Sequence, residues 1–182
     1  MLNIKFEHLV EAMNAFGDKV VEDAKQNLKD KKKVDTGTLE KSVVNNGVKF
    51  MKRSFSLNIG MSDYGAFVDK GVRGVGGVRK MTSTFKRTNN KGKMWKQNGG
   101  DSPYSFKEGV KPSVKHFVAW SNKRGLSPFA VRESVYHQGI KPTYFLKEAI
   151  EENIKLMPKE IAEAFALDVK STVELIAKSN FK

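Results

Sequence analysis

The sequence predicts an α+β fold, with an N-terminal amphipathic helix, an antiparallel sheet, a helical hairpin and a long C-terminal helical region. Helical spacing of apolar residues near both ends of the chain, and two strand-like segments between them, lead to this prediction. The chain has 182 residues, of which 39% are hydrophobic, and this suffices for a single domain with a core. We therefore expect one domain over residues 1–182, into which residues 72–110 are inserted as a basic extended arm or long loop.

The first predicted element is a helix from Phe6 to about Leu28. Its apolar residues recur at steps of three and four, which places them on one side of a helix. Most charged residues of the segment fall on the other side. The helix therefore needs a partner surface, which it would contact through Leu9, Val10, Met13, Phe16, Val20, Val21 and Ala24.

Two strands are predicted next, over residues 42–50 and 53–61. Branched and aromatic residues dominate both, and apolar and polar residues alternate in the second, as in a half-buried strand. The short connection between them favours an antiparallel pair. Asn45, Asn46 and Gly47 interrupt the first strand and predict a bulge or a turn.

The following segment predicts a short helix and then an excursion of the chain. Asp63 can cap a helical turn from Tyr64 to Lys70, and Gly71 can take the left-handed conformation that ends it. Residues 78–109 are rich in Lys, Asn, Gly and Ser and show little periodicity. Long segments of this kind are usually functional or disordered, so we expect them to form the arm.

A helical hairpin is predicted over residues 112–139. Its first half has apolar residues on one helical face, including Phe117 and Trp120. Its second half begins with Ser127 as N-cap and Pro128 at the first helical position, and Gly139 ends it.

The last predicted element is a long amphipathic helical region over residues 141–179. Because Pro158 cannot donate a backbone hydrogen bond, we expect a kink or a short break there. Paired carboxylates such as Glu160 and Glu163 fall on the exposed side, where their expected role is solubility.

The positive charge is concentrated in one part of the chain. Between Lys70 and Arg124 there are 14 Lys or Arg residues against only Asp101 and Glu108, a net charge of +12. The rest of the chain carries 19 basic and 18 acidic residues, a net charge of +1. Such a basic segment suits contact with a polyanion, and it is equally typical of a solvated surface loop.

The residue inventory excludes several chemistries. Without cysteine there is no disulfide and no thiol catalysis, and His8, His116 and His137 lack metal-ligand spacing, so we expect no metal and no cofactor. No apolar run approaches the roughly 18 to 20 residues of a membrane helix. We therefore expect no membrane contact and place the chain in a cytoplasm or in a particle assembled there.

The segment VDTGTLEKSV, after the first helix, is polar enough to suggest a catalytic or phosphate-binding loop. No histidine lies near it in the sequence, and nucleophile-elbow, Walker and dinucleotide spacings are missing. We interpret it as a joint between the first helix and the sheet. Asp35 and Thr36 would accept hydrogen bonds from backbone amides, and Gly37 would allow a close backbone approach. Leu39 would enter the core, and Ser42 would lead into the strand.

Three segments resemble a known family. VDTGTLEKSV is similar to the signature P-V-D-T-G-x-L-x-x-S-I, YGAFVDKGV to Y-A-x-Y-V-E-x-G-T, and GIKPTYFLKEAI to G-x-x-P-x-P-F-L-x-P-A. These signatures are found, in this order, in the minor tail and tail-completion proteins that form the neck between capsid and tail in tailed bacteriophages. The matching residues are Asp35, Thr36, Gly37, Leu39, Ser42, Tyr64, Val68, Asp69, Gly71, Gly139, Pro142, Phe145, Leu146 and Ala149.

The resemblance covers roughly residues 24–152 and implies a structural protein of the virion, not an enzyme. It implies a small α+β fold with a curved sheet packed by helices, and a homo-oligomeric ring, a hexamer or dodecamer, around the channel through which DNA passes. The ring would act as a tail terminator, as a layer of the neck or as an adaptor beneath the portal. The implied partners are other neck, portal or tail proteins, with non-specific contact to phage DNA.

In such a ring the basic arm would contact a neighbouring subunit or protein, line the DNA channel, or remain a surface loop. The first of these is the favoured role. The candidate contact residues are Arg79, Lys80, Lys86, Arg87, Lys91, Lys93, Trp95 and Lys96.

A nucleic-acid-binding protein is the rival function. Residues 70–125 would then contact phosphates, and Trp95, Phe106, Phe117 and Trp120 would stack on bases. We assign these aromatic residues instead to the hydrophobic face of the helix near Trp120, which favours the structural virion protein.

Overall fold

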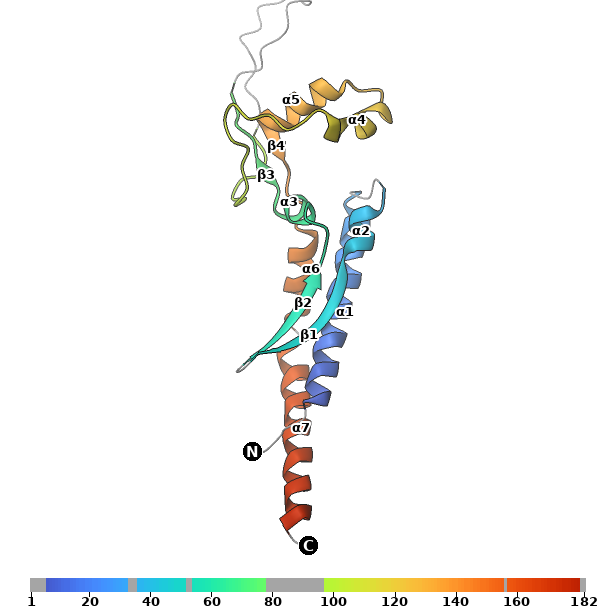
Figure 1. Cartoon of the computed structure of the whole chain (residues 1–182), viewed down its shortest axis with the longest axis vertical. Coiled ribbons are helices and arrows are strands. Elements are labelled where there is room, and N and C mark those ends of the chain that lie inside the picture. The colour runs from blue at the N-terminus through green and yellow to red at the C-terminus, as the bar shows by residue number, and fades with distance from the viewer. Residues whose placement is uncertain (1–5, 33–35, 52–53, 78–96, 156, 181–182) are drawn as a thin grey trace, which may run out of the picture. The chain divides into compact units, whose positions relative to one another are not determined.

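The computed structural model describes residues 6–32, 36–51, 54–77, 97–155 and 157–180 (Figure 1). By its internal contacts the chain divides into two compact units. Unit 1 comprises Met1–Asp63 and Phe145–Lys182, and unit 2 comprises Tyr64–Tyr144. The prediction of an α+β fold is confirmed, whereas the prediction of a single domain stays a prediction.

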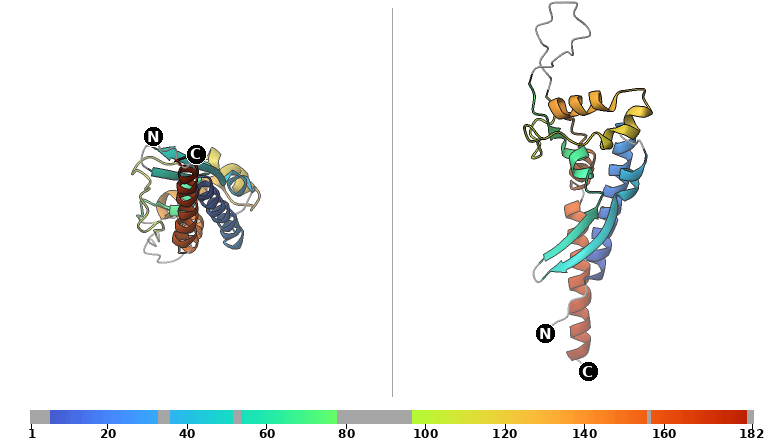
Figure 2. Two further views of the ribbon diagram at one scale, coloured as in Figure 1. Left: turned by 90° about the horizontal axis from the view of Figure 1, so that it is seen from below. Right: turned by 45° about the horizontal axis from the view of Figure 1, so that its top comes forward.

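Unit 1 is built on the predicted N-terminal helix, α1 (Glu7–Asp30). Helices α6 (Phe145–Asn153) and α7 (Met157–Asn180) run antiparallel to α1 and pack along it (Figures 1 and 2). The interruption between α6 and α7 lies just before Pro158, as predicted. Most of the apolar face predicted for α1 is buried, together with residues of α6 and α7: Leu9, Met13, Val20, Val21, Ala24, Leu28, Phe145, Ala149 and Ala164.

A buried carboxylate joins α7 to the beginning of α1. Asp168 is 2% exposed and accepts hydrogen bonds from the backbone amides of His8 (3.1 Å) and Leu9 (2.9 Å). Its Oδ1 also lies 2.7 Å from Nδ1 of His8. These amides belong to the first turn of α1, which has no capping side chain of its own. Asp168 thus caps a helix that lies 160 residues away in the sequence.

The hairpin of β1 (Val44–Met51) and β2 (Ser54–Gly60) lies against α1. The two strands are antiparallel, and the register shifts between Asn45 and Val48, which confirms the predicted pair and its bulge. The Asn45 side-chain amide donates to the backbone oxygen of Asn14 (3.1 Å) and to Asp18 (3.0 Å), both on α1. The bulge therefore serves to fasten the hairpin to the helix.

Unit 2 contains two short strands and three helices within its described residues. α3 (Gly65–Lys70) leads into β3 (Val72–Arg73), and β4 (Gly139–Ile140) pairs with β3 in the antiparallel sense. α4 (Lys115–Asn122) and α5 (Pro128–Gln138) form the predicted helical hairpin (Figure 1).

The predictions for the ends of these helices are confirmed in part. Ser127 is the N-cap of α5, Pro128 is its first residue, and Gly139 follows its end with a φ of 88°. Gly71 ends α3 with a φ of 73°. The prediction that Asp63 caps α3 is wrong, because the N-cap is Tyr64 and no side chain makes a capping hydrogen bond. Here Tyr64 already has helical backbone angles, so the chain enters the helix without an extended capping residue.

Candidate functional site

The first resemblance segment forms a joint within unit 1. It contains a short helix that the sequence did not predict, α2 (Thr38–Ser42), which follows Gly37 with a φ of 74°. Leu39 is buried at 7% exposure, as predicted. The Ser42 hydroxyl donates to the backbone oxygen of Leu39 (2.8 Å) and accepts from the amide of Ser62 (3.0 Å). Ser42 therefore connects α2 to the chain that leaves β2.

One expectation about this joint needs correction. Among the described residues, a Cβ atom on Gly37 would meet nothing nearer than a Lys41 side-chain atom at 3.9 Å, so the glycine serves a left-handed turn and not a close approach. As predicted, the Thr36 hydroxyl accepts a hydrogen bond from the backbone amide of Thr38, although a long one (3.5 Å), and the hydroxyls of Thr36 and Thr38 lie 2.8 Å apart. Asp35 lies outside the described residues.

The second and third resemblance segments meet in unit 2. Val72 pairs with Ile140, and Arg73 pairs with Gly139. The Thr143 hydroxyl donates to the backbone oxygen of Val68 (2.8 Å), and the amides of residues 143 and 144 donate to the backbone oxygen of Asp69 (3.1 and 2.9 Å). Two segments separated by about 70 residues are therefore joined through their backbones, which sequence reasoning did not foresee.

Two glycines of these segments make the contact sterically possible. A Cβ atom on Gly139 would lie 2.2 Å from the backbone oxygen of Val72, and one on Gly71 would lie 2.6 Å from that of Ile140. Both glycines also have positive φ values. A side chain at either position would push the segments apart. Of the other matched residues, Asp69, Phe145 and Ala149 are buried, Val68, Pro142 and Leu146 are half-buried, and Tyr64 is exposed.

The predicted arm is bonded to unit 2 at both of its described ends. Its first two residues, Val72 and Arg73, are strand β3, and the returning chain lies beside that strand. The Ser102 hydroxyl donates to the backbone oxygen of Gly71 (2.7 Å), and the amide of Phe106 donates to that of Arg73 (3.0 Å). The predicted arm, residues 72–110, therefore includes residues at both ends that are bonded to the rest of unit 2. Its candidate contact residues, Arg79, Lys80, Lys86, Arg87, Lys91, Lys93, Trp95 and Lys96, lie outside the described residues.

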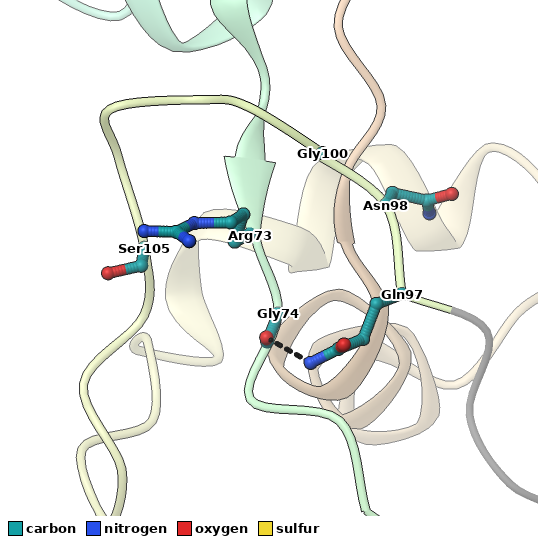
Figure 3. Close-up of a pocket in the computed structure, with 6 residues that line it drawn as sticks. All are labelled: Arg73, Gly74, Gln97, Asn98, Gly100 and Ser105. Carbon is teal, nitrogen blue, oxygen red and sulfur yellow. Dashed lines mark hydrogen bonds between the residues drawn. The ribbon is translucent and has the colours of Figure 1, made fainter.

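An open recess of about 410 Å³ lies where the returning chain meets β3 (Figure 3). Among its described lining residues are Arg73, whose side chain is directed toward Ser105, and Asn98. The side-chain amide of Gln97 donates to the backbone oxygen of Gly74 (2.9 Å). These residues offer hydrogen-bond donors and one positive charge but no carboxylate or imidazole. The described lining of the recess therefore suits an anionic group and contains no general base.

The end of the α4–α5 hairpin combines exposed apolar and basic side chains. Trp120 is 39% exposed, and the guanidinium of Arg124 lies 4.3 Å from the centre of its ring. Leu126 and Phe129 are 48% and 62% exposed. The hydrophobic face of α4 to which the sequence assigned Trp120 is therefore covered only in part, since α4 packs on α5 along one side.

A cluster of charged side chains surrounds Glu133 of α5. Lys111 (2.9 Å) and Arg132 (2.7 Å) both bind the carboxylate of Glu133, and Nε2 of His137 lies 3.6 Å from it. Although partial burial acts to raise the pKa of Glu133, the hydrogen bonds and positive charges of Lys111 and Arg132 lower it below its ordinary value. Glu133 therefore remains ionised and holds the cluster together.

Within the part of the chain that the structure describes, no group of three or more His, Asp or Glu residues could hold a metal ion. His8 and Asp168 resemble the general base and the orienting carboxylate of a catalytic triad. However, Asp168 also accepts hydrogen bonds from two backbone amides, and no described serine or threonine hydroxyl bonds to His8. This pair is a helix cap. No helix of the described residues is long and apolar enough to cross a membrane.

Comparison with known proteins gave no match: no family profile, no curated protein and no solved structure is significantly similar to the chain.

Proposed function

We propose that the chain is a non-enzymatic structural protein of a phage virion, a tail-completion or head-tail connector subunit that assembles as a ring around the DNA channel. The observation that carries this proposal is the large amount of apolar surface that is exposed to solvent. Among the described residues, sixteen large hydrophobic side chains are exposed, whereas the buried core contains thirteen hydrophobic residues. Apolar surface on this scale marks protein–protein contacts, and identical subunits most often cover it by symmetric assembly.

The positions of the three resemblance segments support the same proposal. One forms the joint after α1, and the other two meet where β3 pairs with β4. Most of the described matched residues set backbone geometry or are buried or half-buried, and none of them is among the described residues that line the recess beside Arg73. This is the pattern of residues that maintain a scaffold.

A direct experiment tests this proposal. The purified full-length chain is measured by mass photometry over a range of concentrations and imaged by negative-stain electron microscopy. We expect a ring with a central channel, a hexamer or dodecamer, and we expect antibodies against the chain to label the neck of the phage particle. A strict monomer that is missing from purified virions would overturn the proposal.

Nucleic-acid binding remains a second candidate because of one observation. Trp120, with Arg124 against its ring, is exposed in unit 2, which carries 16 basic and four acidic residues in all. Exposed aromatic rings beside basic groups are the usual platform for single-stranded nucleic acid. A salt titration of binding to a single-stranded oligonucleotide decides it: tight binding by the monomer with a steep salt dependence would favour this candidate over the ring.

A further inference from the structure

The first surface that this inference uses is the end of the α4–α5 hairpin. We call it the hairpin tip and define it by Trp120, Lys123, Arg124, Leu126 and Phe129. Trp120 lies in the last turn of α4, Phe129 lies in the first turn of α5, and the other three belong to the connection. All five side chains are exposed. The hairpin tip therefore presents apolar and cationic groups together at the place where the chain reverses.

The second surface is one side of α7. We call it the acidic face and define it by Glu160, Glu163, Leu167 and Glu174. Their spacing of three, seven and fourteen residues from the first to the others places them within about one sixth of the helical circumference. All four are exposed, and Leu167 is 50% exposed in the middle of the row. Asp168, which binds α1, projects from a different side of the helix.

The acidic face is not covered by α1 within unit 1. Glu160, Glu163 and Leu167 lie on the part of α7 that packs along α1, and they are exposed, while Glu174 lies beyond the start of α1. The Asp168 cap marks the point on α7 where α1 begins, so the part of α7 after this residue extends beyond α1 (Figure 1). At 1.5 Å per residue, the twelve residues from 169 to 180 extend about 18 Å. Over this length Val173 and Leu175 are 58% and 69% exposed. The described part of α7 thus leaves room for another molecule.

The charges of the two surfaces are complementary. Residues 110–141, which contain the hairpin tip, include six Lys or Arg and one Glu, a net charge of +5. Residues 157–180, which form α7 and contain the whole acidic face, include four Asp or Glu and three Lys, a net charge of −1, and residues 7–30 of α1 include six Asp or Glu and three Lys, a net charge of −3. Charge complementarity of this kind steers association and fixes the register of an interface.

We propose that the hairpin tip of one copy of the chain docks on the acidic face of the next copy. Leu167 would be covered by Trp120, Leu126 and Phe129, and the carboxylates around it would face Lys123 and Arg124. Aromatic and Arg side chains at the centre of a contact are the usual energetic anchors. The inference rests on the proposed function, because it supplies the contact through which a ring is built.

The geometry of such a contact explains why it would form a ring. The hairpin tip and the acidic face are different surfaces, so each copy uses one surface toward one neighbour and the other toward the second neighbour. A head-to-tail contact of this type closes into a ring when its rotation permits. A polyanion or an anionic membrane would fit the hairpin tip as well, but it would repel the acidic face. A second copy is the one occupant that satisfies both surfaces.

The test uses two charge-reversed chains. The first carries Lys123→Glu and Arg124→Glu, and the second carries Glu160→Lys and Glu163→Lys. Each chain alone brings like charges together at every contact, so we expect its assembly to need at least about 100-fold higher concentration. In an equimolar mixture, the altered hairpin tip of the first chain meets the altered acidic face of the second, and the two unaltered surfaces also meet. We therefore expect the mixture to assemble at the wild-type concentration.

Matched controls separate the contact from net charge and from folding. Lys107→Glu with Lys141→Glu, and Glu11→Lys with Glu22→Lys, change the net charge by the same amounts at exposed positions elsewhere in the two units. We expect both controls to assemble like the wild type. Circular dichroism should show the same helix content in all variants, since none of the altered side chains is buried.

The outcomes also separate this inference from the proposed function. If the wild type assembles and both reversed chains assemble equally well, the contact is elsewhere, and the inference is overturned while the ring stands. If each reversed chain is monomeric and the mixture is monomeric too, the two surfaces are not partners, and the inference is likewise overturned. If the wild type is itself a monomer and its hairpin tip binds an oligonucleotide or phosphatidylserine vesicles instead, both proposals fail.

Discussion

Among the residues that the structure describes, eleven of the thirteen buried hydrophobic residues belong to unit 1, and two, Val72 and Tyr136, belong to unit 2. The net charges of the two units also differ strongly. Unit 1 has a net charge of +1 and unit 2 a net charge of +12. Unit 1 is thus a helical body with its own core, whereas unit 2 is a basic body with little apolar burial.

The two units therefore obtain their order from different interactions. In unit 1, side chains of α1 and α6 such as Leu28 and Phe145 are removed from water. In unit 2, backbone groups meet directly: β3 pairs with β4, the returning chain bonds to Arg73, and the amide of Val75 donates to the backbone oxygen of Tyr136. Net stabilisation per hydrogen bond is about 1 kcal/mol, while burial of one large apolar side chain contributes about 2 to 3 kcal/mol. Unit 2 should therefore be the less stable unit, and it has more to gain from a partner.

Removing one side chain from the core of unit 1 should have the largest effect. Phe145 is completely buried, so Phe145→Ala should lower the free energy of unfolding by about 3 to 5 kcal/mol. Urea unfolding followed by circular dichroism measures this. The control is Val110→Ala in unit 2, whose side chain is 63% exposed and lies outside the hairpin tip, and whose loss should cost less than about 0.5 kcal/mol. Equal losses in the two variants would contradict the division into a packed and an open unit.

Removing the Asp168 cap should have the next largest effect on stability. Asp168→Ala leaves the amides of His8 and Leu9 without their buried acceptor, which should cost roughly 2 to 3 kcal/mol of unit 1 stability in the same urea experiment. His8→Ala removes only a half-exposed ring and keeps both amide bonds, so it should cost less than about 1 kcal/mol. If His8→Ala costs as much as Asp168→Ala, the ion pair, and not the cap, holds the two helices together.

The same carboxylate predicts a pH dependence. Burial acts to raise the pKa of Asp168, but hydrogen bonds from Leu9 and His8 lower it below its ordinary value. Because the folded pKa is the lower one, the stabilisation is complete above the unfolded pKa of about 3.9 and is lost as pH falls through the folded value. The stability difference between the wild type and Asp168→Asn should therefore be constant near neutral pH and shrink below about pH 4. A difference that stays constant to pH 2 would contradict the lowered pKa.

A smaller effect is expected from the backbone contact of unit 2. Gly139→Ala places a methyl group 2.2 Å from the backbone oxygen of Val72, so β3 and β4 should separate at a cost of about 2 kcal/mol. Hydrogen exchange should become faster at the amides of residues 73, 75 and 76 and stay unchanged in α1. The matched control is Gly109→Ala, which also has a positive φ but open space around it. If both variants exchange alike, the cost comes from the backbone angle and not from the close approach.

Much of unit 1 was predictable from sequence, because its signals are local and periodic. Helical spacing located α1, alternation located β2, and Pro158 marked the interruption before the last helix. The Asp168 cap was not predictable, since its donors lie 160 residues away. The short helix α2 was also missed, because its five residues lie within a segment whose turn residues dominate the pattern.

Unit 2 was predictable to a smaller extent. The helical hairpin followed from Ser127 and Pro128, yet the pairing of β3 with β4 involves only two residues in each strand and leaves no periodic signal. The close backbone approach at Gly139 depends on which segments meet in the fold, and the local sequence does not determine this. The exposure of Trp120 was missed for the same reason: a helical face predicts burial only where a partner surface is present.

The weakest expected effect concerns the charge cluster on α5. Glu133 binds Lys111 and Arg132 and is about one third exposed, so Glu133→Gln should cost unit 2 less than about 1 kcal/mol. Its loss removes the one acidic residue among seven charged residues in 110–141, which strengthens repulsion within the hairpin. Hydrogen exchange of α5 amides should therefore become faster at low salt and approach the wild-type rate in 1 M salt, where charges are screened beyond about 3 Å. Glu151→Gln, which removes an exposed pair with Lys147 at 3.7 Å, should leave α6 exchange unchanged at both salt concentrations. A salt-independent effect at Glu133 would show that its hydrogen bonds, and not the net charge of unit 2, stabilise the hairpin.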